Sequence, residues 1–167
     1  MASQKELDSV YMGTALLHAK LSYAKRKKVG VCLVTKQAVC LTGYNGQPSG
    51  FPNECEELVD GELVTKSTTV HGELNAVLKA AREGISLIGG TLYTTLSCCE
   101  PCAAMLVQTG ISRVVYLESY RSTEGLELLQ QAGILVEQIN LESTDDSVYE
   151  QLNGLIKKIK EEITFLG

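Results

Sequence analysis

Hydrophobic and polar positions along the chain alternate with two periods, one typical of helices and one typical of strands. Residues 7–23 carry apolar side chains at mostly helical spacing, which predicts a first helix. Residues 29–35 and 37–41 are short β-branched or apolar runs with almost nothing between them, so we expect an antiparallel hairpin. Residues 43–69 contain repeated turn signals, Asp60-Gly61 among them, and predict a long, mostly irregular segment. A loop of that length in a compact domain is typically functional or mobile.

The second half of the chain predicts helices and strands in regular alternation. The expected helices are residues 72–83, 100–108 and 123–131, and the expected strands are residues 91–96, 113–117 and 134–139. This order predicts an α/β fold in which neighbouring parallel strands are covered by helices. Residues 145–165 repeat apolar side chains on one helical face opposite Lys and Glu. We expect a C-terminal helix there, either packed on the core or contacting another subunit.

The length and composition describe one ordinary globular domain, spanning residues 1–167. Hydrophobic residues make up 44% and charged residues 21%, which excludes global disorder. Aromatic residues make up only 5% and Trp is absent, so a stacking platform for single-stranded nucleic acid is not expected. The net charge of -5 disfavours a nucleic acid polymer as a partner.

We expect neither export nor membrane insertion for this chain. Its first residues lack a cationic region followed by an apolar run, and no stretch of about 18 apolar residues occurs. The protein is therefore expected in the cytoplasm, in a compartment that keeps thiols reduced. Its six cysteines are then more typical of metal binding or catalysis than of crosslinking.

The residues with the clearest chemistry lie at the starts of two predicted helices. His71 and Glu73 open one helix, and Cys99 and Cys102 open the next one, after an intervening strand. One imidazole and two thiolates leave the fourth position of a tetrahedral zinc ion open, which is the arrangement of a catalytic site. The partial positive charge of a helix N-terminus favours the thiolate form. Glu73 would lie beside a zinc-activated water and move its proton to a substrate nitrogen.

Each part of this pattern also has a plainer interpretation. A lone C-x-x-C after a strand also fits a thioredoxin-type redox pair of Cys99 and Cys102, although that hypothesis leaves the His-x-Glu pair unexplained. A structural zinc ribbon would need a second C-x-x-C or an H-x-x-x-H pair, which the sequence lacks. Cys32 and Cys40 lie in apolar runs and are expected in the core. Cys55 has no predicted role.

Together, the H-x-E and C-x-x-C motifs resemble the signature of zinc-dependent nucleobase deaminases, in which the Glu acts as acid and base. One departure is Cys98, which occupies the position of a Pro in that signature and is a second candidate for the first thiolate ligand. A longer similarity to deoxycytidylate (dCMP) deaminases, within the cytidine/deoxycytidylate deaminase superfamily, covers about residues 8–138. Its most specific part is residues 43–50, GYNGQPSG, and residues 71–76 and 92–96 match as well.

The resemblance to this family implies a fold and a reaction. The fold is the three-layer α-β-α cytidine-deaminase-like fold, with a central mixed sheet of about five strands. The reaction is zinc-dependent hydrolysis of dCMP to dUMP and ammonia, which supplies dUMP for thymidylate synthesis. His71, Cys99 and Cys102 would hold one catalytic Zn²⁺ per chain, and Glu73 would carry protons. Gly72, where the family usually has Ala, would offer its backbone N–H to the pyrimidine carbonyl.

Regulation and assembly are implied by the same resemblance. Many family members are hexamers that dCTP activates with Mg²⁺ and dTTP inhibits, so we expect a homo-oligomer with these effectors. The residues associated with regulation are Gly43, Tyr44, Asn45 and Gly46, and Asn45 would also bond the sugar. Some members bind a second, structural zinc through His and Cys near the long loop. This loop contributes only Cys55, so no second zinc is expected.

The substrate phosphate requires a small cationic pocket. Arg26 lies in a run of three cations before the first strand and is one candidate, although such a run is also typical of a solvated helix end. Arg121 and the adjacent Tyr120 follow a central strand, at the end where α/β sheets bind ligands. Three rival functions stay open: a tRNA adenosine deaminase, a deaminase of another cytosine nucleotide or nucleoside, and a zinc-stabilised protein without catalysis.

Overall fold

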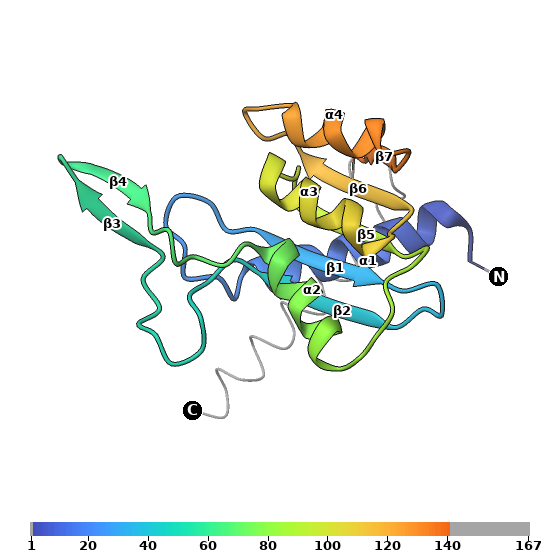
Figure 1. The fold of residues 1–167 in the computed structure, drawn as a ribbon, viewed down its shortest axis with the longest axis horizontal. Coiled ribbons are helices and arrows are strands. Elements are labelled where there is room, and N and C mark those ends of the chain that lie inside the picture. The colour runs from blue at the N-terminus through green and yellow to red at the C-terminus, as the bar shows by residue number, and fades with distance from the viewer. Residues whose placement is uncertain (1, 141–167) are drawn as a thin grey trace, which may run out of the picture.

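The computed structural model describes residues 2–140, and its centre is a five-stranded mixed sheet with the order β2-β1-β5-β6-β7 (Figure 1). Strand β1 (Gly30–Val34) pairs antiparallel with both β2 (Cys40–Tyr44) and β5 (Thr91–Leu96). Strands β6 (Arg113–Glu118) and β7 (Leu135–Gln138) continue from β5 in parallel. The ends of β2, β5 and β6 therefore lie at the same edge as the start of β1.

Helices cover both faces of this sheet (Figure 1). Helix α1 (Gln4–Ala19) packs on one face, in a hydrophobic cluster with side chains from β1, β5 and β6. Helices α2 (Gly72–Arg82) and α3 (Glu100–Thr109) pack on the other face. Helix α4 (Glu124–Gln131) lies against α3 and β7. The predicted fold class, a three-layer α/β fold with a mixed sheet of five strands, is confirmed.

Local sequence explains where several helices begin and end. A capping box starts α1, since the Ser3 hydroxyl accepts the N–H of Glu6 and the Glu6 carboxylate accepts the N–H of Ser3. Pro101 occupies the first turn of α3, where its missing N–H would have no helical partner. Gly110 ends that helix in the left-handed conformation, which costs glycine little.

The first helix and the second strand are shifted from their predicted positions. The helix predicted for residues 7–23 is wrong at both ends. The capping box starts α1 earlier, and beyond its end the Ser22 hydroxyl donates to the backbone oxygen of Asn45, which holds the chain in a non-helical path. The strand predicted for residues 37–41 is also wrong, because the turn includes Val39, whose N–H donates to the Thr35 hydroxyl. Strand β2 begins only at Cys40.

The segment 43–69 is mostly irregular, as predicted, but it also contains an unpredicted hairpin of β3 (Glu56–Val59) and β4 (Glu62–Thr65). Asp60 and Gly61 join the two strands with φ angles of 53° and 82°. Two consecutive positive φ angles are typical of the two-residue type I′ turn that Asp-Gly favours. The hairpin projects from the body of the domain (Figure 1), and its side chains are mostly exposed.

The six cysteines are free thiols in this fold. Cys32 is fully buried in the cluster under α1, as predicted. Cys40 is exposed, so its predicted place in the core is wrong. It begins β2, which is an edge strand of the sheet and has a neighbour on one side only. Cys55 is buried where the chain enters the hairpin.

A buried ion pair fastens α1 to the sheet. Two guanidinium nitrogens of Arg113 donate to the Asp8 carboxylate at 2.7 Å each, and the Tyr93 hydroxyl donates to it at 2.7 Å. Burial alone would raise the pKa of Asp8, but hydrogen bonds from Arg113, Tyr93 and Gln4 outweigh it and hold that pKa below its usual value. Asp8 is therefore charged and paired at neutral pH.

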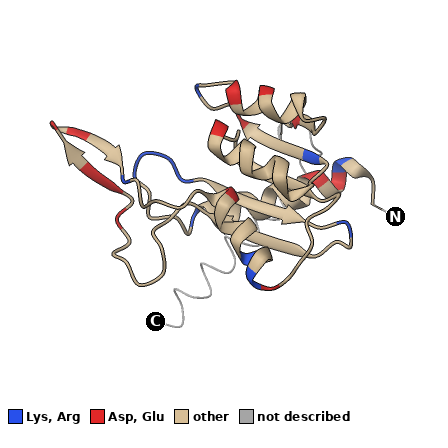
Figure 2. Cartoon of the chain, in the orientation of Figure 1, with Lys and Arg blue, Asp and Glu red and all other residues tan. Residues whose placement is uncertain are grey.

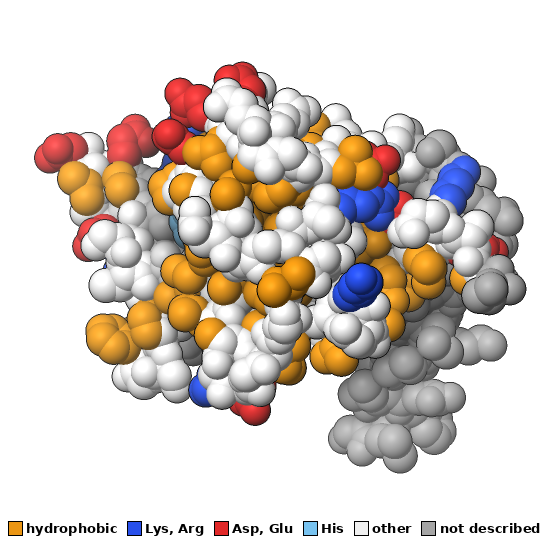
Figure 3. Space-filling view, turned by 45° about the vertical axis from the view of Figure 1, so that its right-hand side comes forward, with side chains coloured by type: hydrophobic (Ala, Val, Ile, Leu, Met, Phe, Trp, Pro, Cys, Tyr) orange, Lys and Arg blue, Asp and Glu red, His pale blue; other side chains and the backbone are white. Residues whose placement is uncertain are grey.

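Acidic side chains are concentrated on one side of the molecule. They lie along the hairpin and at the starts of α3 and α4 (Figure 2), and Figure 3 shows acidic groups gathered toward the same side of the surface. Among the described helices, none is long and apolar enough to cross a membrane. The C-terminal helix predicted for residues 145–165 lies outside the described residues.

Candidate active site

Two helix N-termini meet at the edge of the sheet where β2, β5 and β6 end. His71 is the N-cap residue of α2 and Cys99 is the N-cap residue of α3, and both have extended backbone angles. Neither side chain caps its own helix, so both remain available for other contacts. Cys102 follows in the first turn of α3. The two helix starts thus converge, as their positions in the sequence predict.

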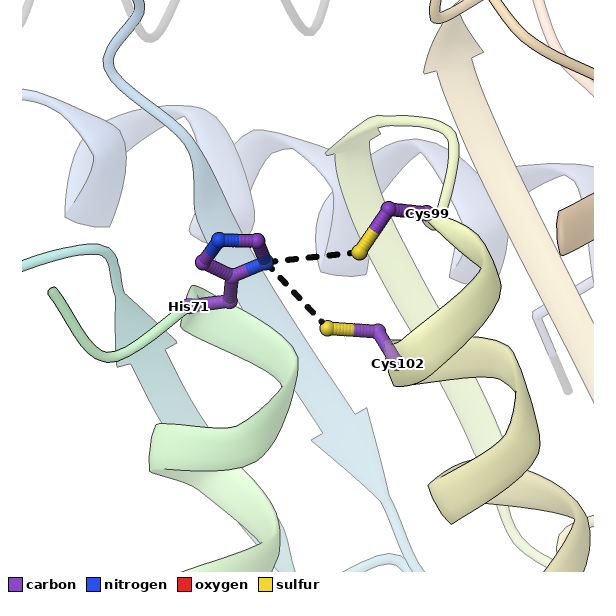
Figure 4. A group of neighbouring side chains, drawn as sticks. All are labelled: His71, Cys99 and Cys102. Carbon is purple, nitrogen blue, oxygen red and sulfur yellow. Dashed lines mark hydrogen bonds between the residues drawn. The ribbon is translucent and has the colours of Figure 1, made fainter. Parts of the chain in front are cut away.

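His71, Cys99 and Cys102 point toward one another from these two helix starts (Figure 4). Nδ1 of His71 lies 3.4 Å from Sγ of Cys99 and 3.4 Å from Sγ of Cys102. Bonds of about 2.3 Å from zinc to sulfur and about 2.0 Å to nitrogen, at tetrahedral angles, separate the two ligand atoms by about 3.5 Å. The donor set and its spacing therefore fit a zinc ion, and three ligands leave one coordination position open.

The two thiols of this group hold their protons unequally. Hydrogen bonds from the Cys102 thiol and the His71 ring lower the pKa of Cys99 to about 4, although burial opposes them. The hydrogen bond to Cys99 raises the pKa of Cys102, which keeps its proton. The contact with Cys99 also raises the pKa of His71. A zinc ion would bind two thiolates and a neutral imidazole, so its binding would displace the proton that Cys102 keeps.

Glu73 lies in the first turn of α2 and is only 4% exposed. Burial raises the pKa of its carboxyl, while its own backbone N–H and the charge of His71 partly offset that rise. A buried carboxyl with a raised pKa accepts and returns a proton more readily near neutral pH than an exposed one. Such a group, next to a possible metal centre, is suited to proton transfer.

The structure separates the two alternatives for the first thiolate ligand. Cys99 groups with His71 and Cys102, whereas Cys98 is fully buried and its thiol bonds the carboxylate of Glu73. Burial and the neighbouring Glu73 charge raise the pKa of Cys98 well above its usual value. Cys98 therefore stays a neutral thiol beneath the carboxyl.

A cavity of about 250 Å³ opens beside these groups. On one side it is lined by the two helix starts, including His71, Glu73 and Cys99. It is also lined by the chain between α1 and β1, by the end of β2 and by the base of the hairpin. The cavity therefore brings together parts of the chain that are far apart in the sequence.

Most of the predicted substrate-binding residues line this cavity. Arg26, Asn45, Gly72 and Tyr120 all contribute to its walls. Arg121 is not among the lining residues; it is exposed, and its guanidinium carbon lies 5.5 Å from the centre of the Tyr120 ring. The cation nearest to the cavity is therefore found before β1 and not after β6.

Asn45 fixes the wall of the cavity through its side chain. Its Oδ1 accepts the N–H of Val29 at 2.8 Å, and its Nδ2 donates to the backbone oxygen of Lys27 at 2.9 Å. An amide has two lone pairs and two hydrogens, so each end keeps one further bond for a ligand.

Gly43, Tyr44, Asn45 and Gly46, which are predicted to take part in regulation, lie at the end of β2 and contact the start of α2 and the chain just before it. Gly43 lies so close to α2 that a Cβ there would sit 2.2 Å from the backbone oxygen of Gly72. The backbone oxygen of Tyr44 accepts a bond from Asn75 at 3.0 Å, and Gly46 pairs with Val70 in an isolated bridge. These contacts give the GYNG segment a structural role at the site.

Sequence reasoning missed the cavity residues that come from the hairpin and its neighbourhood. Glu56, Thr65 and Thr69 line the cavity, and none of them belongs to a recognisable motif. The sequence signal that could have indicated the hairpin is Asp60-Gly61, because a two-residue turn of this kind pairs the strands on either side of it. Lys27 also lines the cavity and forms an ion pair with Glu118 at 2.5 Å.

Comparison with known proteins matches residues 5–118 to the family described as the cytidine and deoxycytidylate deaminase zinc-binding region. The deoxycytidylate deaminase of Saccharomyces cerevisiae is 38% identical over 140 residues, which cover 80% of this chain. They cover 45% of the yeast protein, so the chain spans less than half the length of that relative. The deoxycytidylate deaminase of Mycobacterium phage D29 is 36% identical over 125 residues, covering 68% of this chain and 96% of the phage protein.

Among solved structures, the dCMP deaminase of cyanophage S-TIM5 in complex with dCMP and dUMP is similar to this fold. The TM-score is 0.76 and the sequence identity is 40%. The match covers 83% of this chain and 100% of the cyanophage chain. The family match over residues 5–118 includes both helix starts that carry the site.

Proposed function

The chain belongs to the cytidine and deoxycytidylate deaminase family, and we propose that it hydrolyses the 4-amino group of dCMP, giving dUMP and ammonia. One observation carries this proposal: His71 and Cys99 of the His71, Cys99 and Cys102 group line the same cavity as the buried Glu73 and Arg26. Groups that could remove an amino group and a cation that could bind a phosphate thus line one cavity. The dUMP formed would supply thymidylate synthesis.

His71, Cys99 and Cys102 would hold one zinc ion per chain, because their atoms have the spacing of tetrahedral ligands. When bound, zinc supplies a water molecule whose pKa falls from ~15.7 to ~7. The chain itself contributes the lowered pKa of Cys99, which provides a thiolate for the metal.

Glu73 would carry the protons of the reaction. It would take a proton from the attacking water, place it on the ring nitrogen N3, and deliver a proton to the amino group that leaves as ammonia. Burial supports this role, because it raises the pKa of the carboxyl. Gly72 begins α2, and the N–H groups of a first helical turn have no partner within the helix. Its N–H would therefore be free to bond the pyrimidine carbonyl.

Asn45 would bond the sugar with the amide hydrogen and lone pair left over from its backbone contacts. Arg26 would bind the phosphate, and Lys27 and Tyr120 line the same cavity. Arg121 would act at most through the Tyr120 ring on which it stacks.

The reaction is tested by comparing dCMP, deoxycytidine and dCTP as substrates of the zinc-loaded protein. Fast dUMP formation with little nucleoside turnover is expected. Glu73→Gln is expected to keep the fold and the zinc and to lose about 10³-fold in kcat, the usual range for a general acid–base. A Glu73→Gln variant with a rate near that of the wild type would contradict the role of Glu73.

The phosphate site is tested separately from the reaction. Arg26→Ala is expected to raise KM for dCMP about tenfold or more and to leave KM for deoxycytidine unchanged, because a hydrogen bond to a charged group contributes about 1.5–3 kcal/mol. Arg121→Ala is expected to have a smaller effect. Equal changes for the nucleotide and the nucleoside would refute a phosphate contact.

Regulation and assembly complete the proposal. The resemblance of Gly43, Tyr44, Asn45 and Gly46 to the regulatory segment of the family supports activation by dCTP with Mg²⁺, inhibition by dTTP and a hexamer. Dose–response curves for both nucleotides and the mass of the assembly in solution test this part. The free state of all six cysteines supports a reducing compartment such as the cytoplasm.

A further inference from the structure

One wall of the cavity is made by residues 22–29, which join α1 to β1 without regular secondary structure. This 22–29 segment carries a run of cations and passes beside the base of the acidic hairpin (Figure 2). Irregular backbone keeps a fixed shape only when its polar groups are bonded elsewhere. The position of Arg26 in the cavity therefore depends on what holds this segment.

The two ends of the segment are held by Asn45. Its backbone oxygen accepts the hydroxyl of Ser22 at 2.7 Å. Its side chain bonds Lys27 and Val29, as described above. The N–H of Ala24 donates to the Ser22 hydroxyl at 3.1 Å, so residues 25 and 26 are left to be held by another element.

Glu56 holds that middle part. It is the first residue of β3 and is 9% exposed. Its Oε1 accepts the N–H of Lys25 at 3.0 Å and the N–H of Arg26 at 3.1 Å, and its Oε2 also accepts the N–H of Lys25 at 3.1 Å. Two consecutive N–H groups directed at one carboxylate form an anion-binding nest.

The residue opposite Glu56 in the hairpin holds the side chain of Arg26. Glu56 pairs with Thr65 across the two strands, and the Thr65 hydroxyl accepts Nη1 of Arg26 at 3.1 Å. One cross-strand pair thus fixes both the backbone and the guanidinium of Arg26. A planar guanidinium grips phosphate with two parallel bonds only in a defined orientation, so its placement matters as much as its charge.

We propose that Glu56 is a positioning residue which, together with Thr65, sets the guanidinium of Arg26 and thereby determines the preference of the cavity for a 5′-phosphorylated nucleotide over a nucleoside. This inference rests on the proposed function, in which Arg26 binds the phosphate. Glu56 acts through Arg26 and contacts neither the base nor the reacting groups.

The measured quantity is the ratio of kcat/KM for dCMP to kcat/KM for deoxycytidine. Glu56→Gln replaces one accepting oxygen by an NH₂ group, which cannot accept an N–H, and the ratio is expected to fall about tenfold through KM for dCMP. Thr65→Val keeps the shape of the residue, removes the hydroxyl and is expected to lower the ratio in the same direction. Glu57→Gln, at the exposed next position of β3, is the matched control and is expected to leave the ratio unchanged.

A double-mutant cycle shows whether Glu56 acts through Arg26. Adding Glu56→Gln to Arg26→Ala is expected to leave the ratio where Arg26→Ala alone puts it. If the double variant lowers the ratio by the product of the two single effects, the proposal is overturned. An equal loss of kcat/KM for dCMP and for deoxycytidine in Glu56→Gln would also overturn it. If Glu56→Gln does not fold, the same cycle is measured with Thr65→Val in its place. A ratio in the Thr65→Val single variant equal to that of the wild type would also overturn the proposal.

A binding measurement separates this inference from the proposed reaction. If the zinc-loaded wild type does not deaminate dCMP, the proposed function fails. The role of Glu56 in positioning Arg26 is then tested by measuring the affinities for dUMP and deoxyuridine in titration calorimetry. The wild type is expected to bind dUMP more tightly than deoxyuridine, and an affinity for dUMP that falls about tenfold in Glu56→Gln supports the positioning role of Glu56. A wild type that binds both equally overturns it, even if the deamination of dCMP is established.

Discussion

Gly43→Ala is the substitution whose effect follows most directly from the geometry of the site. A Cβ at residue 43 would lie 2.2 Å from the backbone oxygen of Gly72 and 3.0 Å from the backbone nitrogen of Ala76. Ordinary contact begins at 3.4 Å, so β2 and the start of α2 must separate by about 1.2 Å, the difference between 3.4 and 2.2. Both atoms belong to the backbone, and a side-chain rotation cannot relieve the clash.

The displaced part of α2 is the turn that carries His71 and Glu73. Overpacking of this kind costs about 1–3 kcal/mol of stability. A misplacement of about 1 Å in a catalytic constellation costs about 10²-fold in rate. We therefore expect Gly43→Ala to lower the melting temperature and to lower kcat for dCMP about 100-fold.

The assay is steady-state deamination of dCMP by the zinc-loaded protein, together with thermal unfolding. Gly13→Ala is the control, because a Cβ there meets nothing within 4 Å and lies in α1. Alanine is a better helix former than glycine by up to about 1 kcal/mol, so this variant is expected to be slightly more stable and equally active. A Gly43→Ala variant with wild-type stability and turnover would refute the reasoning.

Two further predictions concern the metal and the ion pair under α1. Cys102→Ala is expected to lose zinc, and elemental analysis that finds about one ion per chain would contradict the ligand set proposed here. Asp8→Asn is expected to cost about 1.5–3 kcal/mol of unfolding free energy at pH 7, because it removes the charge from two hydrogen bonds to Arg113, whose remaining carboxylate partner is Glu137. The folded pKa of Asp8 lies below its unfolded value of about 3.9, so the wild type keeps this advantage above about pH 4 and loses it as the pH falls through the folded pKa. Urea unfolding at pH 7 and pH 3 measures the difference, and an equal deficit at both values would refute the role of the Asp8 charge.

The sequence was sufficient for the fold class and for the centre of the site. From residue 72 onward, each described helix and strand lies within one residue of its predicted bounds. The H-x-E and C-x-x-C motifs were informative because both sit at helix starts, whose positions the sequence marks well.

The hairpin was missed because its strands do not have a buried face. Of the four residues in β3 only Glu56 is buried, and β4 alternates only between exposed and half-buried side chains. Hydrophobic periodicity therefore had no signal there, although Asp60-Gly61 marked the turn.

The sequence also could not show whether Arg26 or Arg121 lines the cavity. Both arginines lie in loops at the same edge of the sheet, and only tertiary contacts decide which one reaches the cavity. Thr65 holds the guanidinium of Arg26, whereas Arg121 stacks on Tyr120. The contact of Arg26 with Thr65 joins residues 39 positions apart and leaves no local pattern.

The two walls of the cavity belong to different kinds of structure, and this division has a consequence for protein engineering. The proposed reacting groups sit at the starts of α2 and α3, whose helices are packed into the core, whereas Arg26, Lys27, Glu56 and Thr65 line the cavity from segments outside that core. A library of variants confined to residues 24–28 and 56–65 would sample new substrates on an unaltered catalytic centre. We therefore expect substitutions that accept a different 5′-substituent to be found in residues 24–28 and 56–65 more readily than in α2 or α3.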